Sequence, residues 1–61
     1  MIKVTLKMGK TIYINPHWIE SVGKDNSGTT CIYVYNNDGS YLVQEDVNTI
    51  VNRIEADRKE E

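Results

Sequence analysis

The chain has 61 residues, a net charge of −2 and a pI near 5.2. This length fits one small domain near the lower limit for independent folding, and the acidic balance gives no electrostatic footprint for nucleic acid or an anionic membrane. No apolar run is long enough for a membrane span or a secretion signal, and the single cysteine offers no disulfide within the chain. We therefore expect one cytoplasmic domain over residues 1–58 and a frayed tail over 59–61. So small a core favours a protein partner or a homo-oligomer.

The first segment predicts a β-hairpin. Residues 1–7 alternate apolar and polar side chains, with the period of a strand. The three-residue loop that follows, Lys7–Met8–Gly9, ends in the glycine that closes such a turn. This loop predicts the cross-strand pairs Ile2–Ile14, Lys3–Tyr13, Val4–Ile12 and Thr5–Thr11.

A corner interrupts the second strand at Asn15 and Pro16. Asn before Pro suits the cap and the first position of a helical turn, so we expect a single turn here. Trp18 and Ile19 are predicted to pack inward as its plug. A short third strand and a polar turn are expected next, over residues 20–23 and 24–28.

The stretch from Thr29 to Val47 predicts a second hairpin that runs into a helix. Asn37–Asp38–Gly39 is again a three-residue loop ending in glycine. It predicts the pairs Asn36–Ser40, Tyr35–Tyr41, Val34–Leu42 and Ile32–Gln44. This register separates an aliphatic face from a tyrosine face. The aliphatic face holds Ile32, Val34 and Leu42, and the tyrosine face holds Tyr33, Tyr35, Tyr41 and Val43.

The last element is an amphipathic helix. Asp46 can cap it, and Glu45 places a second negative charge at the positive end of its dipole. One apolar stripe contains Val47, Ile50, Val51 and Ile54. Helix-spaced ion pairs are expected for Arg53–Asp57 and Glu55–Lys59. The predicted fold class is α+β: a small antiparallel β-sheet or partly open barrel of four or five strands, with two glycine-closed hairpins and one C-terminal amphipathic helix.

Few residues could carry out chemistry. His17 and Cys31 lack the spacing of metal ligands. Glu45 and Asp46 could serve in general acid–base catalysis, but capping explains them more simply. The four glycines are scattered turn residues and form no phosphate cradle. We therefore predict no catalytic residue, no cofactor and no metal, and so no enzyme.

The tyrosines are the candidate partner-binding residues. The predicted registers place all four opposite the aliphatic core, and tyrosine is enriched at protein interfaces. The same rings could instead be structural cross-strand pairs. A stacking platform for RNA is a third reading, which the missing basic rim disfavours. The residues concerned are Tyr13, Tyr33, Tyr35 and Tyr41.

Several short motifs together carry a family resemblance over nearly the whole chain. They include Met1–Thr5, Gly9–Lys10, Tyr13–Pro16, Ile19–Val22, Thr29–Ile32, Tyr41–Val43 and Ile50–Ile54. These motifs resemble the small flagellar FlbD family, also called the swarming-motility SwrD family. The resemblance implies a cytoplasmic accessory protein that supports flagellar motor function, with no catalytic residues.

Two alternatives stay open beside this resemblance. The turn over residues 23–28 and the loop over residues 36–39 depart from the family pattern, and the helix is more acidic. A phage or mobile-element protein that binds a host protein could use the same scaffold. A small RNA- or DNA-binding β-module, similar to the carbon storage regulator, would use the lysines of the first hairpin and the tyrosines. That regulator's basic strand near the C-terminus has no counterpart here.

Overall fold

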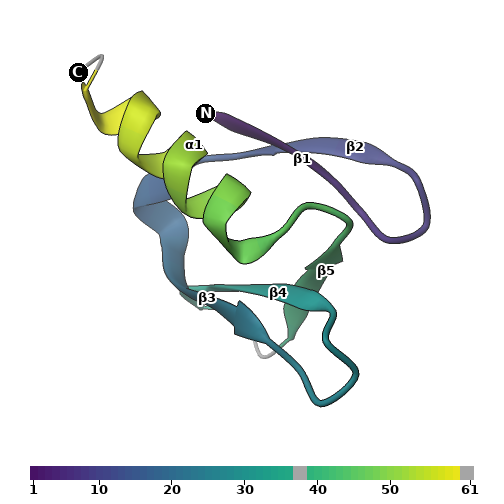
Figure 1. Ribbon diagram of the computed structural model, residues 1–61. Coiled ribbons are helices and arrows are strands. Elements are labelled where there is room, and N and C mark those ends of the chain that lie inside the picture. Colours follow the sequence, from purple (N-terminus) through teal and green to yellow (C-terminus); the bar gives the residue numbers. More distant parts are fainter. Residues whose placement is uncertain (37–38, 60–61) are drawn as a thin grey trace.

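A computed structural model describes residues 1–36 and 39–59 of the chain. In this part the order is β1 (Ile2–Thr5), β2 (Thr11–Ile14), the 3₁₀ turn η1 (Pro16–Trp18), β3 (Ile19–Lys24), β4 (Thr30–Val34), β5 (Ser40–Val43) and α1 (Val47–Lys59). The strands make two antiparallel sheets, β1–β2 and β3–β4–β5. The helix packs across them (Figure 1). The chain is therefore α+β, as predicted.

The β1–β2 hairpin has the predicted register. Its pairs are Ile2 with Ile14, Lys3 with Tyr13, Val4 with Ile12 and Thr5 with Thr11. The Leu6 N–H donates to the Lys10 carbonyl at 2.7 Å, and the Gly9 N–H donates to the Leu6 carbonyl at 2.8 Å. Gly9 has a φ of 104°, which side chains rarely tolerate. The glycine is therefore what allows this loop to be so short.

The corner at η1 forms where it was expected, but the predicted plug is wrong for Trp18. The Asn15 Oδ1 atom accepts the His17 N–H at 3.0 Å, which caps the turn. Pro16 is buried, whereas Trp18 is 56% exposed. A 3₁₀-helix has about three residues per turn, so Pro16 and Ile19 lie on the same side of it, whereas Trp18 lies on another side. Pro16 and the partly buried Ile19 are thus the inward residues of this corner.

The second hairpin has a different register from the predicted one, displaced by three residues. The observed pairs are Thr30 with Val43, Cys31 with Leu42, Ile32 with Tyr41 and Tyr33 with Ser40. An odd displacement turns each side chain of β5 to the opposite face. Val43 is consequently 3% exposed and Leu42 39% exposed, the reverse of the expectation. The predicted loop residues Asn37 and Asp38 lie outside the described residues.

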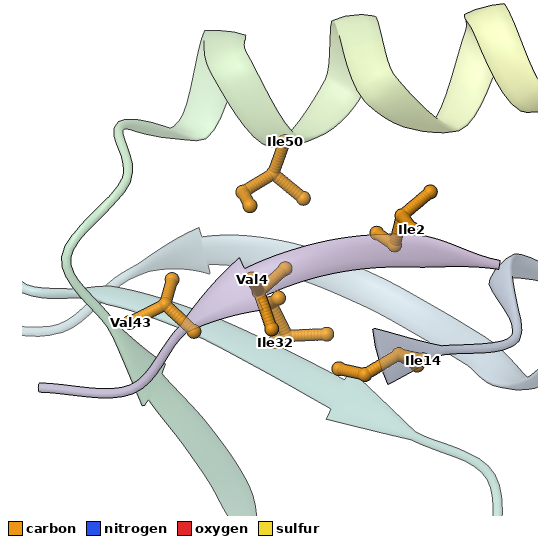
Figure 2. Packing of buried hydrophobic residues seen from close by; sticks show 6 residues of the cluster. All are labelled: Ile2, Val4, Ile14, Ile32, Val43 and Ile50. Carbon is orange, nitrogen blue, oxygen red and sulfur yellow. The ribbon is translucent and has the colours of Figure 1, made fainter. Parts of the chain in front are cut away.

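The core draws on both sheets and on the helix. Its buried members are Ile2, Val4, Ile14, Ile32, Val43 and Ile50. Figure 2 shows Ile50 pointing from the helix towards the strands, with Ile2 and Val4 on β1 beneath it. Val51 is 37% exposed, so the predicted apolar stripe is wrong at that position. An antiparallel bridge between Leu6 and Val43 joins the two sheets. These contacts combine the sheets and the helix into one packed unit.

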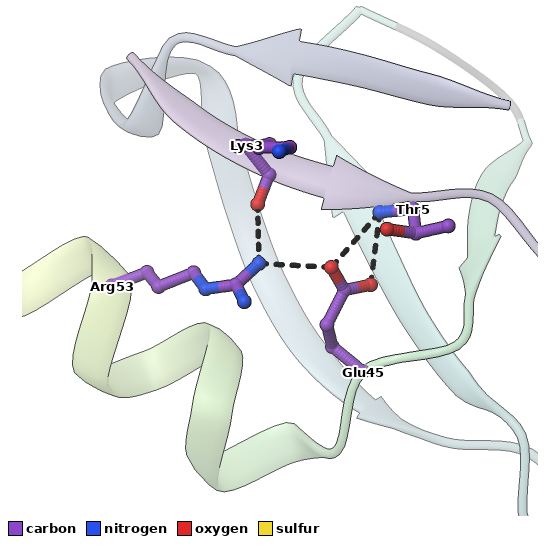
Figure 3. Close-up of polar contacts among 4 residues, drawn as sticks. All are labelled: Lys3, Thr5, Glu45 and Arg53. Carbon is purple, nitrogen blue, oxygen red and sulfur yellow. Dashed lines mark hydrogen bonds and ion pairs between the residues drawn. The ribbon is translucent and has the colours of Figure 1, made fainter.

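Polar groups from the C-terminal part close the outer edge of β1 (Figure 3). The Thr5 N–H donates to both carboxylate oxygens of Glu45, at 2.9 and 3.0 Å. Arg53 Nη1 donates to the Lys3 carbonyl at 2.6 Å and to Glu45 Oε2 at 2.8 Å. The Gln44 N–H donates to the Thr5 carbonyl at 2.8 Å. These contacts occupy the outward N–H of Thr5 and the outward carbonyls of Lys3 and Thr5.

The polar side chains of the helix have partners that differ in part from the predicted ones. Arg53 pairs with Glu45, and Asp57 accepts from the amino group of Met1 at 2.9 Å, in place of the predicted Arg53–Asp57 pair. Asp46 does cap the helix, because its carboxylate accepts the Asn48 N–H at 3.3 Å. No helix in the described ranges is both long and apolar enough to cross a membrane.

Candidate functional surface

The four tyrosines do not form one common face. Tyr41 lies on the inner face of β5, opposite Ile32, and is partly buried against the core. Tyr33 lies on β4 of the second sheet and Tyr35 directly follows that strand, and both are exposed. Tyr13 belongs to the first sheet and is 62% exposed. The single tyrosine face expected from the sequence is wrong for Tyr41, because it depended on the predicted register of β5, which differs from the observed one.

Tyr13 and Tyr41 nevertheless both line a surface that we name the apolar groove. Its larger part, of ≈ 660 Å³, runs along β2 and is lined by Lys10, Ile12, Tyr13, Trp18, Val34 and Tyr41, among others. A smaller part, of ≈ 500 Å³, continues beside Leu6, Met8, Leu42 and Tyr41. Both volumes are in the range of ligand-binding pockets, about 300–1,000 Å³. The surface is an open groove with mainly aliphatic and aromatic walls.

The backbone of β2 forms one border of this groove. The Leu6–Lys10 hydrogen bond makes every second pair from there, Val4–Ile12 and Ile2–Ile14, a hydrogen-bonded pair. The N–H and C=O groups of Thr11 and Tyr13 therefore point away from β1. Within residues 1–36 and 39–59, no strand pairs with that side of β2. β2 is thus an open edge beside an apolar groove.

Charge is distributed unevenly around the groove. Residues 1–14 contain three lysines and no acidic residue, a charge of +3, so the rest of the chain carries −5 to reach the total of −2. Lys10 lines the larger part and Lys7 the smaller one. Of the residues described, no Asp or Glu lines either part. The groove is therefore apolar with a cationic border.

The residues that could carry out chemistry are held in hydrogen bonds or buried. Burial alone would raise the pKa of Glu45, but hydrogen bonds from Thr5, from the Glu45 backbone and from Arg53 outweigh it and lower that pKa below its ordinary value. Hydrogen bonds from Ser27 and from the Thr29 backbone lower the pKa of Asp25 in the β3–β4 turn. Cys31 is buried in β4. Among the described residues, no three of the types His, Cys, Asp and Glu are placed to hold a metal ion.

Sequence reasoning missed several members of the groove. The sequence pattern predicts Trp18 in the core and Leu42 on the aliphatic face, and it predicts Met8 only as a loop residue. Met8 could have been recognised, because the tip of a tight hairpin has nothing to pack against. Trp18 and Leu42 depend on the geometry of η1 and on the register of β5, which local patterning did not determine.

Fold and surface together define a small α+β protein with an open strand edge next to an exposed apolar groove. The model of the FlbD family, described as flagellar and swarming motility proteins, matches residues 1–60. The chain therefore belongs to the FlbD family, as its motifs suggested, and is a small protein related to flagellar and swarming motility. A search of curated proteins and a search of solved structures each gave no match.

Proposed function

We propose that this chain is a non-enzymatic, cytoplasmic protein-interaction module that supports flagellar motility. The observation that carries the proposal is the apolar groove, where Tyr13 and Trp18 expose 62% and 56% of their surface. Large apolar side chains gathered around one groove are typical of interaction sites. Membership of a family of flagellar and swarming motility proteins gives the process in which the contact would serve.

The polar residues support a binding role over a catalytic one. Glu45 is held by the Thr5 N–H and by Arg53, so its carboxylate is engaged in the structure of the β1 edge. Asp46 is engaged as the cap of the helix. The exposed groove, in contrast, has apolar walls and offers contact area. A surface of this kind selects a partner by shape and burial.

A complementation experiment tests the proposal. In a motile bacterium that carries this gene, deletion should reduce swarming, and the wild-type gene should restore it. A Tyr13→Ala/Trp18→Ala variant should fail to restore it, because both residues line the groove and expose large aromatic side chains there. The variant should keep its far-UV circular dichroism, since both side chains are mostly exposed. Full restoration by this variant, or no effect of the deletion, would contradict the proposal.

The matched control is Tyr33→Ala/Tyr35→Ala, which removes two exposed tyrosines that line neither part of the groove. It should restore swarming. If it fails while folded, the partner surface lies around Tyr33 and Tyr35 at the end of β4, and the groove assignment is wrong. Fluorescence anisotropy with single-stranded RNA gives a further check. Tight binding that falls steeply with salt would assign the function to nucleic-acid binding.

A further inference from the structure

We propose that the apolar groove binds an extended segment of a partner protein, which adds as a strand to the outer edge of β2 and carries acidic residues beside its apolar ones. This inference rests on the proposed function and specifies the chemistry of the partner. Three features of this surface support it: the backbone groups on the outer edge of β2, the volume of the groove beside that edge, and the positive charge around it.

The backbone is the first feature. The outward N–H and C=O groups of Thr11 and Tyr13 are spaced to pair with an added strand. The two edges of the hairpin differ, because Glu45, Arg53 and Gln44 close β1, whereas no described strand covers β2. Exposed strand edges recruit extended segments through main-chain hydrogen bonds. The geometry therefore favours strand addition at β2.

The side chains are the second feature. Successive side chains of an added strand point alternately to opposite faces of the sheet, so every second one would face the groove. The groove runs beside β2, since residues 12–15 line its larger part together with Val34 and Tyr41. Its volume of ≈ 660 Å³ accommodates apolar side chains of the partner. The segment should therefore have apolar residues at alternate positions.

Charge is the third feature, and it distinguishes among possible partners. Lys10 lines the groove. Lys3 lines neither part of it but lies opposite Tyr13 on the outer face of the hairpin, where it adds to the positive charge around β2. Lys7 donates to Thr29 at 3.4 Å and lies near Asp25, so it contributes less. A symmetric pair of copies joined at β2 would bring two hairpins of charge +3 together. Complementarity therefore favours an acidic partner over a second copy.

Nucleic acid fits this surface less well than an acidic peptide. Binding to a phosphate backbone gains its affinity from many cationic contacts. Among the described residues, Lys7 and Lys10 alone supply cationic side chains to the groove lining, and residues 15–61 carry −5. The apolar walls of Ile12, Val34 and Leu6 also offer little to a sugar–phosphate backbone. A peptide uses both the walls and the lysines.

The test is selection from a library of short random peptides against the purified full chain. Enriched peptides should alternate apolar residues and contain Asp or Glu beside them. Trp18 is the single tryptophan and lines the groove, so a bound peptide should change its fluorescence. Addition of a strand should slow hydrogen exchange at the amides of Thr11 and Tyr13. Enriched peptides without an acidic bias, or binding without protection of these two amides, would overturn the inference.

Charge reversal provides a matched pair of variants. Lys3→Glu/Lys10→Glu should slow association of the acidic peptide roughly tenfold and remove most of its salt dependence. Arg58→Glu/Lys59→Glu makes the same change in net charge at the exposed end of the helix and should have little effect. Equal losses in both variants would mean that net charge alone matters, and would overturn the inference.

The outcomes separate this inference from the proposed function. If Tyr13→Ala/Trp18→Ala abolishes swarming but selected peptides lack acidic residues, the groove binds a partner of different chemistry. If sedimentation shows a stable dimer that protects Thr11 and Tyr13, the edge of β2 belongs to self-association and the acidic-partner inference fails. If peptides bind as expected while the deletion leaves swarming unchanged, only the motility role fails.

Discussion

Glu45 and Arg53 form an ion pair of 2.8 Å that lies across the outer edge of β1. Each residue also contacts the strand itself, Glu45 through the Thr5 N–H and Arg53 through the Lys3 carbonyl. The Glu45 side chain is only 12% exposed, so its charge is largely removed from water. The pair therefore connects the helix to the first strand and also satisfies backbone groups that an edge strand would otherwise expose.

Disrupting this pair should destabilise the fold. We expect Glu45→Gln to lower the free energy of unfolding by about 1–3 kcal/mol, because charge-assisted hydrogen bonds to the Thr5 amide and to Arg53 are lost. Arg53→Met should have a similar effect. In a double-mutant cycle measured by urea denaturation, the two losses should be non-additive by about 0.5–3 kcal/mol. Additive losses would mean that the two residues act separately.

Stability should decrease in acid through the same carboxylate. The pKa of Glu45 is below its ordinary value of 4.5, so the folded state favours the ionised form. This contribution is fully present above the unfolded-state pKa near 4.5, and it is lost as the pH falls through the lower folded-state pKa. Urea denaturation across the acid range should show a smaller loss for Glu45→Gln than for the wild type. Parallel pH profiles would contradict the assignment.

The orientation of the helix can be tested with two adjacent residues. Ile50 is 0% exposed and Val51 is 37% exposed. Ile50→Ala should cost about 2–5 kcal/mol of stability, because it leaves a cavity between the helix and β1. Val51→Ala should stay within about 0.5 kcal/mol of the wild type, as surface substitutions usually do. Thermal denaturation of the two variants measures this, and comparable losses would show that the helix presents a different face.

The loop of the first hairpin should require its glycine. Gly9 has a φ of 104° and nothing within 4 Å of an added Cβ, so Gly9→Ala introduces backbone strain without a steric clash. We expect a loss of about 1–2 kcal/mol. Gly23 in β3 also has open space around it and no positive φ, so Gly23→Ala should be neutral or slightly stabilising. Equal effects in chemical denaturation would mean that the φ of Gly9 is not what matters.

The two hairpins show when a register can be predicted from sequence. In β1 and β2, aliphatic residues alternate with Lys, Thr and Tyr, so a displaced register would bury polar side chains. In β5, Tyr41, Leu42 and Val43 are all apolar, and either face could be turned inward. The prediction then depended on the loop alone. The chain has Asn36 at a φ of 63° and pairs Tyr33 with Ser40, so the connection is longer than a three-residue turn.

Only part of the groove is visible in the sequence. Of the four predicted tyrosines, Tyr13 and Tyr41 line the groove and the other two do not. The sequence pattern predicts inward positions for Trp18 and Leu42, which also line it. The role of Glu45 was also beyond local reasoning. Its partner Thr5 is 40 residues away, whereas the prediction considered only the adjacent helix. Contacts between distant segments determine both the groove and the closed edge, and neither leaves a periodic signal in the sequence.

The closed edge of β1 also has a consequence during synthesis on the ribosome. β1 and β2 emerge first, but Glu45 bonds Thr5 from 40 residues later, and Arg53 bonds Lys3 from 50 residues later. At ordinary rates of about 5–20 residues per second, the nascent hairpin waits for several seconds with both edges open. During that interval the edge of β1 is open to mispairing, and the interval ends only when Glu45 and the helix have left the ribosome and packed against the hairpin.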